Sequence, residues 1–382
     1  MSIVAGQPSS DSRGPSRGVY VHIPFCAERC DYCAFVTYVG VDDLHGRYCD
    51  AVISELGARE GGRATAASSV FFGGGTPSRV DPVLLGRILE AIPREVGCEV
   101  TVEVNPEDAT VRTLETLARV GVTRVSIGIQ STAPHVLADL GRVHRGGEVR
   151  ELSMLVDSIG FSSWSMDLIV GSRAESDDDL KRTLADLLDH DHRPPHLSAY
   201  LLTVERGTPL GRDPLRHPDD DDLARRYEIV DEALSERGYG WYEVSNWALP
   251  GSECRHNQLY WDQGDYIGVG AAAHSHEAGR RSWNVANLEK YLQRIEEGVS
   301  AEQGFEILDD DAQRFEALAL ALRTKKGVPV GAFGSVTDLE GFIEVSGERL
   351  ILTRRGRLMA DSLVPRLDID AVTSFSRGGV GR

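Results

Sequence analysis

Features that would place the chain in a membrane or stabilise it through disulfides are scarce in its 382 residues. No apolar run approaches the roughly 18 residues that a membrane-spanning helix requires. Six cysteines are few for this length, and the first 17 residues lack the apolar core of a signal peptide. We therefore expect a cytoplasmic protein without a membrane span, whose thiols stay reduced or bind metal.

An excess of positive charge is also missing. The chain has 41 Lys and Arg residues against 59 Asp and Glu, a formal net charge of −18. Sequence-independent binding to nucleic acid needs clustered Lys and Arg to neutralise phosphates, so we expect no nucleic-acid partner. The acidic run that starts at Pro218 is expected to form the first turn of a helix, where carboxylates face the positive end of the helix dipole.

Six short β-rich runs alternate with segments of helical periodicity. They begin at Gly18, Ser68, Cys98, Thr123, Ser163 and His196. Six β-then-α units in a row predict an α/β fold with a parallel sheet and helices outside it. Several runs are apolar almost throughout, as expected when both faces of a strand are covered. We therefore predict an incomplete TIM-like (β/α)6 barrel with its functional residues at the carboxyl ends of the strands.

The pattern divides the chain into five parts. Residues 18–205 carry the β/α alternation, and 206–300 form an α+β extension with an aromatic and polar block. Residues 301–370 are predicted to form a small winged-helix-like module. The Ser-, Gly- and Arg-rich ends, 1–17 and 371–382, are predicted to be disordered tails.

The first predicted strand is followed by "HIPFCAERCDYCAF", which places Cys26, Cys30 and Cys33 within eight residues. Cysteine thiolates hold iron–sulfur clusters, normally one for each iron of a cubane, so three thiolates leave one iron open. A zinc site with a remote fourth ligand, or three unrelated thiols, is the alternative. Zinc sites usually contain paired C-x2-C motifs, which are missing here.

The C-x3-C-x2-C spacing, with Tyr32 before the last cysteine, resembles the signature of the radical S-adenosylmethionine (SAM) superfamily. In that superfamily the three cysteines hold a 4Fe-4S cluster, and the amino and carboxylate groups of SAM chelate the open iron. An electron from the cluster then cleaves SAM to a 5′-deoxyadenosyl radical. The resemblance implies a 4Fe-4S cluster on Cys26, Cys30 and Cys33, SAM as a second cofactor, and an electron donor.

The segment "FFGGGTPS" follows the second predicted strand. Consecutive glycines let a backbone approach a ligand closely, and the segment matches neither a Walker loop nor a dinucleotide-binding turn. In the superfamily this segment binds the methionyl amino group of SAM, which implies a role for Gly74, Gly75 and Thr76. Further SAM contacts match the branch related to oxygen-independent coproporphyrinogen III dehydrogenase, namely Tyr20, Glu103, Gln130, Arg142 and Asp167. Without the family, each would be interpreted as a structural hydrogen-bonding residue.

Within this branch, the chain resembles the HemW family more than the dehydrogenase. The dehydrogenase motif continues to a fourth cysteine, and Phe35 stands at that position. The sequence "CRHNQLYW" carries the H-N-x-x-Y-W arrangement typical of HemW, at His256, Asn257, Tyr260 and Trp261. The resemblance extends over roughly residues 18–370. It departs at "GSRAESDDDL", where the family commonly has a proline and a second glycine, so this loop is expected to differ.

HemW proteins are heme chaperones, so the resemblance implies that the protein binds heme and delivers it to an acceptor hemoprotein, which can be a membrane protein. His256 is the candidate heme residue. Cys254, His274 and His276 are alternatives, because heme iron needs an axial donor of this kind. A structural role for His256 between barrel and module is equally open. No C-x-x-C-H motif is present, so no c-type covalent linkage is expected.

Two other functions remain open, and no catalytic residue is assigned. One is a radical SAM dehydrogenase that decarboxylates coproporphyrinogen III in heme biosynthesis. The other is a cluster or zinc protein that binds no tetrapyrrole.

Replacing Cys26, Cys30 or Cys33 by Ala should abolish the 4Fe-4S absorbance after anaerobic reconstitution, because each thiolate holds one iron. Cys49→Ala and Cys98→Ala are the controls and should keep the absorbance, since these cysteines lie in helix-like and strand-like segments. Full cluster occupancy in the Cys30→Ala protein would contradict the assignment.

Overall fold

The computed structural model describes residues 17–60, 66–142, 149–335 and 337–370. Six parallel strands form the centre of its large sheet, and they coincide with the six predicted runs: β1 (Arg17–Ile23), β4 (Ala67–Gly74), β5 (Arg94–Val104), β6 (Arg124–Gln130), β7 (Ser163–Val170) and β8 (His196–Leu201). The predicted tails lie outside the described residues, except for Arg17, which begins β1.

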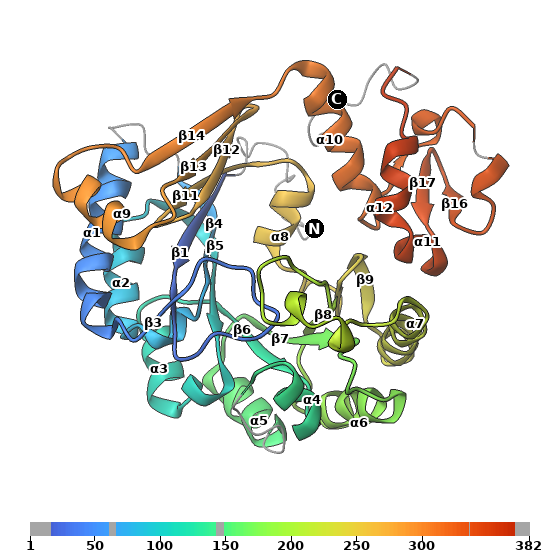
Figure 1. Ribbon diagram of the computed structural model, residues 1–382, viewed down its shortest axis with the longest axis horizontal. Coiled ribbons are helices and arrows are strands. Elements are labelled where there is room, and N and C mark those ends of the chain that lie inside the picture. Colours follow the sequence, from blue (N-terminus) through green and yellow to red (C-terminus); the bar gives the residue numbers. More distant parts are fainter. Residues whose placement is uncertain (1–16, 61–65, 143–148, 336, 371–382) are drawn as a thin grey trace, which may run out of the picture.

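Helices follow the strands and pack on the outside of the curved sheet (Figure 1). They are α1 (His45–Glu60), α2 (Pro82–Glu90), α3 (Val111–Arg119), α4 (Pro134–Asp139), α5 (Val149–Ile159), α6 (Asp177–Leu188) and α7 (Asp220–Glu236). Helix α3 shows why such segments fold: the Thr110 side chain caps its first turn, and Leu114 and Leu117 are buried on one face. The predicted incomplete (β/α)6 barrel is therefore confirmed.

Several of the runs are apolar almost throughout, but β6 has an apolar face and a polar one. In β6, Val125, Ile127 and Ile129 are buried in the core shared with the outer helices. Ser126 and Gly128 alternate with them and line a pocket inside the barrel. Since successive side chains of a strand point to opposite faces, the apolar residues serve the helix side and the polar ones the interior.

The chain after β8 widens both edges of the same sheet. At one edge, β10 (Asn246–Ala248) pairs antiparallel with β8 and with β9 (Gly240–Glu243). At the other, β11 (Asp265–Val269) pairs parallel with β1 and leads to the antiparallel strands β12 (His274–Glu277), β13 (Arg280–Asn284) and β14 (Glu302–Ile307). Helix α9 (Leu288–Glu296) packs on α1, and α8 (Arg255–Trp261) packs on β1 and β4.

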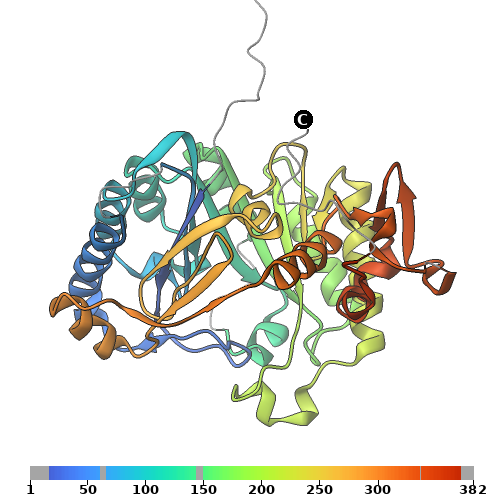
Figure 2. The same ribbon diagram turned by 90° about the horizontal axis from the view of Figure 1, so that it is seen from above.

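A small unit follows β14 and has its own core. Helix α10 (Asp310–Leu322) leads to a three-stranded sheet of order β15 (Val328–Pro329), β17 (Arg349–Leu352) and β16 (Ile343–Ser346), followed by α11 (Arg354–Leu358) and α12 (Ala360–Leu363). Figures 1 and 2 show it at the side of the molecule opposite α1 and α9. No helix in the described ranges combines the length and apolar character needed to cross a bilayer.

The acidic run forms the helix start that the sequence predicts. The Asp219 side chain accepts hydrogen bonds from the backbone N–H groups of Asp221 and Asp222 at the beginning of α7. Carboxylates at this end of a helix are stabilised by its dipole. The run is therefore part of the scaffold.

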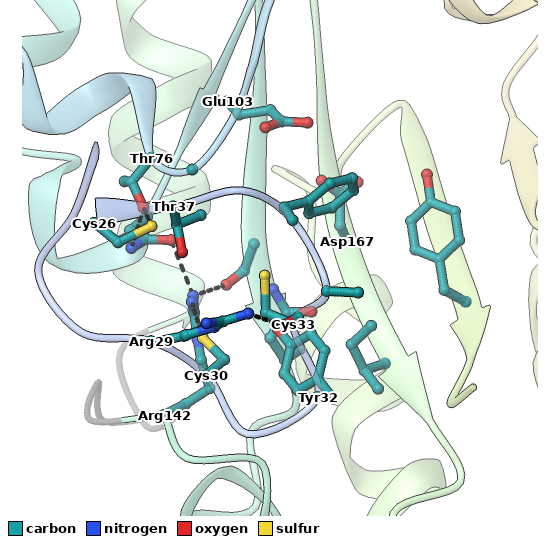
Figure 3. Close-up of a pocket in the computed structure, with 18 of the residues that line it drawn as sticks. Cys26, Arg29, Cys30, Tyr32, Cys33, Thr37, Thr76, Glu103, Arg142 and Asp167 are labelled. Atoms are coloured by element: carbon teal, nitrogen blue, oxygen red, sulfur yellow. Dashed lines mark hydrogen bonds between the residues drawn. The ribbon is translucent and has the colours of Figure 1, made fainter. Parts of the chain in front are cut away.

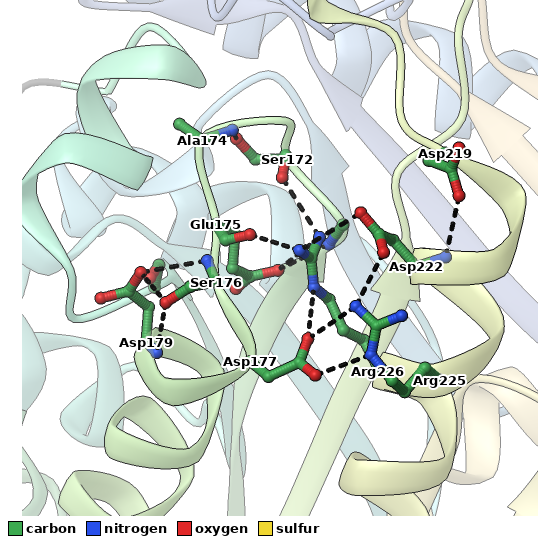
Figure 4. A network of polar contacts seen from close by, with 12 residues as sticks. Ser172, Ala174, Glu175, Ser176, Asp177, Asp179, Asp219, Asp222, Arg225 and Arg226 are labelled. Atoms are coloured by element: carbon green, nitrogen blue, oxygen red, sulfur yellow. Dashed lines mark hydrogen bonds and ion pairs between the residues drawn. The ribbon is translucent and has the colours of Figure 1, made fainter.

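The loop after β7, where the sequence departs from the family pattern, is held by a buried arginine of α7 (Figure 4). Arg226 is 5% exposed, donates to the carbonyl oxygens of Ser172 and Glu175, and lies 3.3 Å from an Asp177 carboxylate oxygen. The backbone N–H of Gly171 donates to the Glu175 carboxylate at 2.7 Å. Burial raises the pKa of Glu175 to about 7, although the Gly171 hydrogen bond and the Arg226 charge act in the opposite direction.

Replacing Arg226 by Gln should lower the free energy of unfolding by about 3–5 kcal/mol, because a buried carboxyl group and two carbonyls lose their partner. The neighbouring Arg225 is a matched control: its side chain is 48% exposed and it also pairs with Asp177, at 2.7 Å. Arg225→Gln should cost less than about 1 kcal/mol. Equal shifts of the urea midpoint in the two variants would show that the buried contacts of Arg226 contribute no more to stability than the exposed ones of Arg225.

Candidate functional site

A pocket of about 560 Å³, here called the outer pocket, opens at the carboxyl ends of the parallel strands (Figure 3). Parallel strands place the residues that follow them at one rim, as the sequence analysis expects. All predicted cluster and SAM residues except Tyr20 line this pocket: Cys26, Cys30, Cys33, Gly74, Gly75, Thr76, Glu103, Gln130, Arg142 and Asp167.

Cys26 ends the short strand β2 (Phe25–Cys26), and Cys30 and Cys33 lie on the loop that leads from it to β3 (Tyr38–Val39). All three thiols are free and partly exposed. Inside the loop, the Cys33 N–H donates to the Cys30 carbonyl at 3.2 Å. The His22 ring, on β1, contacts this loop: its Nε2 lies 3.1 Å from the Val36 carbonyl oxygen.

Hydrogen-bond donors reach two of the sulfurs. Thr76 Oγ1 lies 3.6 Å from Cys26 Sγ, and Arg142 Nη1 lies 3.4 Å from Cys30 Sγ. Burial raises the pKa of Cys26, and the Thr76 hydrogen bond partly offsets this. Donors to sulfur are among the groups that set the potential of an iron–sulfur cluster.

The spacing of the thiols fits a cubane better than a single metal ion. Within the described ranges, no three His, Cys, Asp or Glu side chains form a group that could hold one metal ion. Each cysteine of a cubane binds a different iron, so its sulfurs do not converge on one point. Three free thiols around one pocket therefore suit a 4Fe-4S cluster with one open iron.

The glycine segment packs closely against β1 and β2, which lead into the cysteine loop. Gly74 has a φ of +114°, and a Cβ there would lie 2.4 Å from the His22 ring. A Cβ on Gly75 would lie 2.8 Å from the Phe25 carbonyl oxygen. The glycines therefore allow close packing of the chain on itself, a role that the sequence interpretation, which considered only ligand approach, did not include.

Two carboxyl groups and one guanidinium set the electrostatics of the outer pocket. Burial, and then the charge of Asp167, raise the pKa of Glu103 to about 8, while the Gly74 N–H donates to its Oε2 at 3.1 Å. Asp167 accepts a 2.7 Å hydrogen bond from Ser126, and burial raises its pKa. Arg142 is fixed by the Gly128 carbonyl oxygen at 2.9 Å. This set suits a ligand that carries both an ammonium and a carboxylate group.

A second space of about 280 Å³, here called the inner cavity, adjoins the outer pocket inside the barrel. Both spaces are lined by Gly74, Glu103, Ser126 and Asp167. Tyr20 lies in the inner cavity, with its hydroxyl 3.0 Å from Nδ1 of His22. Within the described structure, Tyr20 thus contacts the interior space and not the outer pocket.

The H-N-x-x-Y-W block forms α8, which covers the barrel interior at the amino ends of β1 and β4. His256 is fully buried, with Nδ1 2.9 Å from Ser69 Oγ and Nε2 2.9 Å from the Tyr260 hydroxyl. Burial lowers its pKa to about 3, so the ring is neutral. Asn257 and Tyr260 line the inner cavity, whereas Trp261 lines a groove beside Lys326.

The alternative heme residues differ in accessibility. Cys254 is buried, its thiol donates to Glu99, and burial raises its pKa to about 12. His276 is buried, with Nδ1 3.2 Å from the Gly264 carbonyl oxygen. His274 is exposed, and its ring stacks on Trp283 at a centroid distance of 6.1 Å. An imidazole can bind iron without rearrangement only where a ring nitrogen is accessible, which favours His274.

Sequence reasoning did not identify several residues of the inner cavity, among them Arg124, His196 and Tyr200. These three come from positions on β6 and β8 that point inward in alternation with core residues. The signal was present in the sequence as a polar residue at every second position of a strand otherwise rich in apolar residues.

Comparisons with known proteins agree with this geometry. The sequence profile of the Radical SAM superfamily matches residues 20–187. "Heme chaperone HemW" of Mycobacterium tuberculosis (strain CDC 1551 / Oshkosh) is 40% identical over 374 residues, covering 93% of this chain and 95% of that protein. "Heme chaperone HemW" of Escherichia coli (strain K12) is 36% identical over 269 residues, which cover 68% of this chain and 70% of that protein.

Among solved structures, "Coproporphyrinogen III oxidase (HemN)" from Escherichia coli, a radical SAM enzyme, superimposes with a TM-score of 0.80 at 21% identity. The match covers 92% of this chain and 89% of that one, and it supports the fold alone. Barrel, cysteine loop and profile together define a radical SAM protein. Within this class, the chain belongs to the HemW family.

Gly74→Ala should destabilise the protein by about 1–3 kcal/mol, because the residue has a left-handed φ and its new Cβ meets the His22 ring. Cluster content should fall as well, since His22 holds the cysteine loop. Gly57, in α1, is the control: it has nothing within 4 Å of its Cβ position, and Gly57→Ala should stabilise the helix by roughly 0.5–1 kcal/mol. Thermal unfolding and iron content measure both effects, and unchanged values in Gly74→Ala would exclude the packing role.

Proposed function

We propose that this protein is a heme chaperone that binds a 4Fe-4S cluster and SAM and transfers heme to an acceptor hemoprotein. The observation that carries the proposal is the 40% identity to the heme chaperone HemW of Mycobacterium tuberculosis over nearly the whole chain. The electron donor, the identity of the acceptor and the cytoplasmic location stay predictions.

Cys26, Cys30 and Cys33 are the proposed cluster ligands. Support comes from their free, partly exposed thiols around one pocket and from the donors Thr76 and Arg142 beside the sulfurs. A bound cluster of this kind supplies electrons one at a time. Phe35, which stands where the dehydrogenase has a further cysteine, is 64% exposed and lines both the outer pocket and the inner cavity.

The other residues of the outer pocket are proposed to bind SAM. Glu103 and the Gly74–Thr76 segment suit the ammonium group, because a cation beside Glu103 favours its ionised form. Arg142 is a fixed partner for a carboxylate. Asp167 and Gln130 offer polar atoms for hydroxyl groups at the same rim. Tyr20 would support the cofactor from the inner cavity, against Phe71, on which its ring stacks.

Heme binding is proposed to involve α8 and β12. His256 stays a prediction as a heme residue, but both of its ring nitrogens are occupied, so ligation requires the Ser69 or the Tyr260 contact to break. Without such a rearrangement, His256 supports the packing of α8 on β4 through its contact with Ser69. His274, whose ring is exposed, is the candidate among the four that can supply an axial nitrogen as it stands.

The purified protein, reconstituted anaerobically, should bind heme and form no protoporphyrinogen from coproporphyrinogen III, even with SAM and a strong reductant. A Soret titration and a product assay measure the two parts. Production of protoporphyrinogen would show that the protein is a dehydrogenase and would contradict the proposed chaperone function. Absence of both heme binding and product would favour a cluster protein with no tetrapyrrole.

Two histidine variants refine this experiment. His274→Ala should shift the Soret band, because the iron loses a nitrogen ligand, while thermal stability stays nearly unchanged at this exposed site. His256→Ala should leave the band in place and lower the melting temperature, because two buried hydrogen bonds are lost. A Soret shift in His256→Ala and none in His274→Ala would identify His256 as the heme ligand.

A further inference from the structure

The barrel interior contains a buried arginine that the proposed function does not use. Arg124 is the first residue of β6, so it lies at the amino end of the barrel, opposite the rim that carries the cysteines. It is 2% exposed and lines the inner cavity. Burying a guanidinium is costly unless it is paired, so its environment calls for an explanation.

Two nitrogens of Arg124 have no hydrogen-bond partner among the described residues. They are Nε and Nη2, which form one edge of the guanidinium group. Glu99 and Asp167 act on Arg124 through their charges, but neither accepts a hydrogen bond from Nε or Nη2. This edge presents two parallel N–H donors, the arrangement that matches both oxygens of a carboxylate.

Further unpartnered polar atoms lie at the same end of the barrel. His196, the first residue of β8, lines the inner cavity and has its Nε2 2.8 Å from the Tyr242 hydroxyl, while its Nδ1 is buried without a partner. Thr101 pairs with Arg124 in the β5–β6 register, shares a face with Glu103, and has a buried Oγ1 without a partner in the described structure. Buried polar groups are normally hydrogen-bonded, so three such residues together indicate a ligand site.

We propose that the inner cavity binds the carboxylate group of an organic ligand, with the Nε and Nη2 edge of Arg124 as its anchor. His196 lies at the same end of the cavity, and Thr101 is the β5 residue that pairs with Arg124 in the sheet. Four aromatic rings, those of Tyr20, Phe71, Tyr200 and Tyr260, form part of the remaining walls beside the polar Ser126, Ser198 and Asn257, and they suit an apolar body attached to the carboxylate. About 280 Å³ lies at the lower end of small-molecule sites, which span roughly 300–1,000 Å³, so the cavity takes a side arm or a small acid and not a whole macrocycle.

The charge balance of the cavity permits an anion. Glu103 and Asp167 are the acids among its lining residues; burial raises the pKa of both, that of Glu103 to about 8, while the charge of Arg124 acts in the opposite direction on Asp167. Asp167 is in addition satisfied by Ser126 and Ser165, at 2.7 and 3.4 Å. Burial also lowers the pKa of His196, so this ring stays neutral. Arg124 is thus the fixed positive charge among the residues that line the cavity.

Two sources offer this chemistry. One is a propionate arm of heme that reaches inward through the rim of the barrel when SAM does not fill the outer pocket, which shares Glu103, Ser126 and Tyr200 with the cavity. The other is a free aromatic monocarboxylic acid. The first source rests on the proposed function and the second does not.

The experiment titrates full-length protein with three probes: heme, heme dimethyl ester, whose carboxylates are blocked, and benzoate. The wild type should bind a carboxylate probe about 10- to 100-fold more tightly than Arg124→Gln, as the loss of hydrogen bonds to a charged group implies. The affinity of Arg124→Lys should lie between these two values, because lysine keeps the positive charge but lacks the two parallel N–H donors of the guanidinium group. Arg87→Gln removes an exposed charge on α2 that pairs with Asp50, and it should match the wild type.

The outcomes separate the sources. A preference of the wild type for heme over its ester, lost in Arg124→Gln, assigns the site to a propionate. Equal binding of heme and ester, with benzoate bound by the wild type and released by Arg124→Gln, assigns it to a free acid. Arg124 variants that match the wild type with every probe overturn the proposal. If Arg124→Gln does not fold, the proposal is tested by the affinity of Arg124→Lys and by the preference of the wild type for heme over its ester. A wild type that binds no heme contradicts the proposed function, while the benzoate titration still tests this site.

Discussion

The alternation of side chains along the central strands is the constraint on which the core and both ligand spaces depend. A parallel sheet inside a barrel is covered on both faces, and its interior is usually filled by bulky branched side chains. In β6 the outward residues Val125, Ile127 and Ile129 follow this rule, whereas Arg124 and Ser126 point inward. Small and polar inward residues leave space where packed layers would otherwise lie. The same strands thus provide stability on one side and a binding site on the other.

Rim and interior are joined by a short chain of contacts. The Tyr20 hydroxyl in the inner cavity lies 3.0 Å from His22, and the other ring nitrogen of His22 lies 3.1 Å from the Val36 carbonyl oxygen in the cysteine loop. Gly74 packs on the same ring, and its N–H donates to Glu103. Glycine, histidine and tyrosine therefore act together in placing the cluster loop over the barrel.

The H-N-x-x-Y-W block divides its residues among three environments. His256 pairs with Ser69 and Tyr260, Asn257 and Tyr260 face the inner cavity, and Trp261 lies in a groove beside Lys326. Helical spacing accounts for two of these relations: His256 and Tyr260, four residues apart, contact each other, and Asn257 and Tyr260, three apart, share the cavity. A motif that the sequence presents as one unit thus closes the barrel and lines its cavity at the same time.

The sequence by itself determined the order and type of the elements. The six β-rich runs became β1 and β4 to β8, the acidic run became the start of α7, and the cysteines with Gly74, Glu103 and Asp167 came to one rim, because strand direction alone brings the carboxyl ends together. Such features depend on local periodicity and chain order, which a sequence displays. Only the tertiary structure decided that Arg124 and His196 share a buried cavity and that His256 has no free nitrogen. These facts depend on contacts between residues far apart in the chain, such as Ser69 with His256, and no local pattern specifies them.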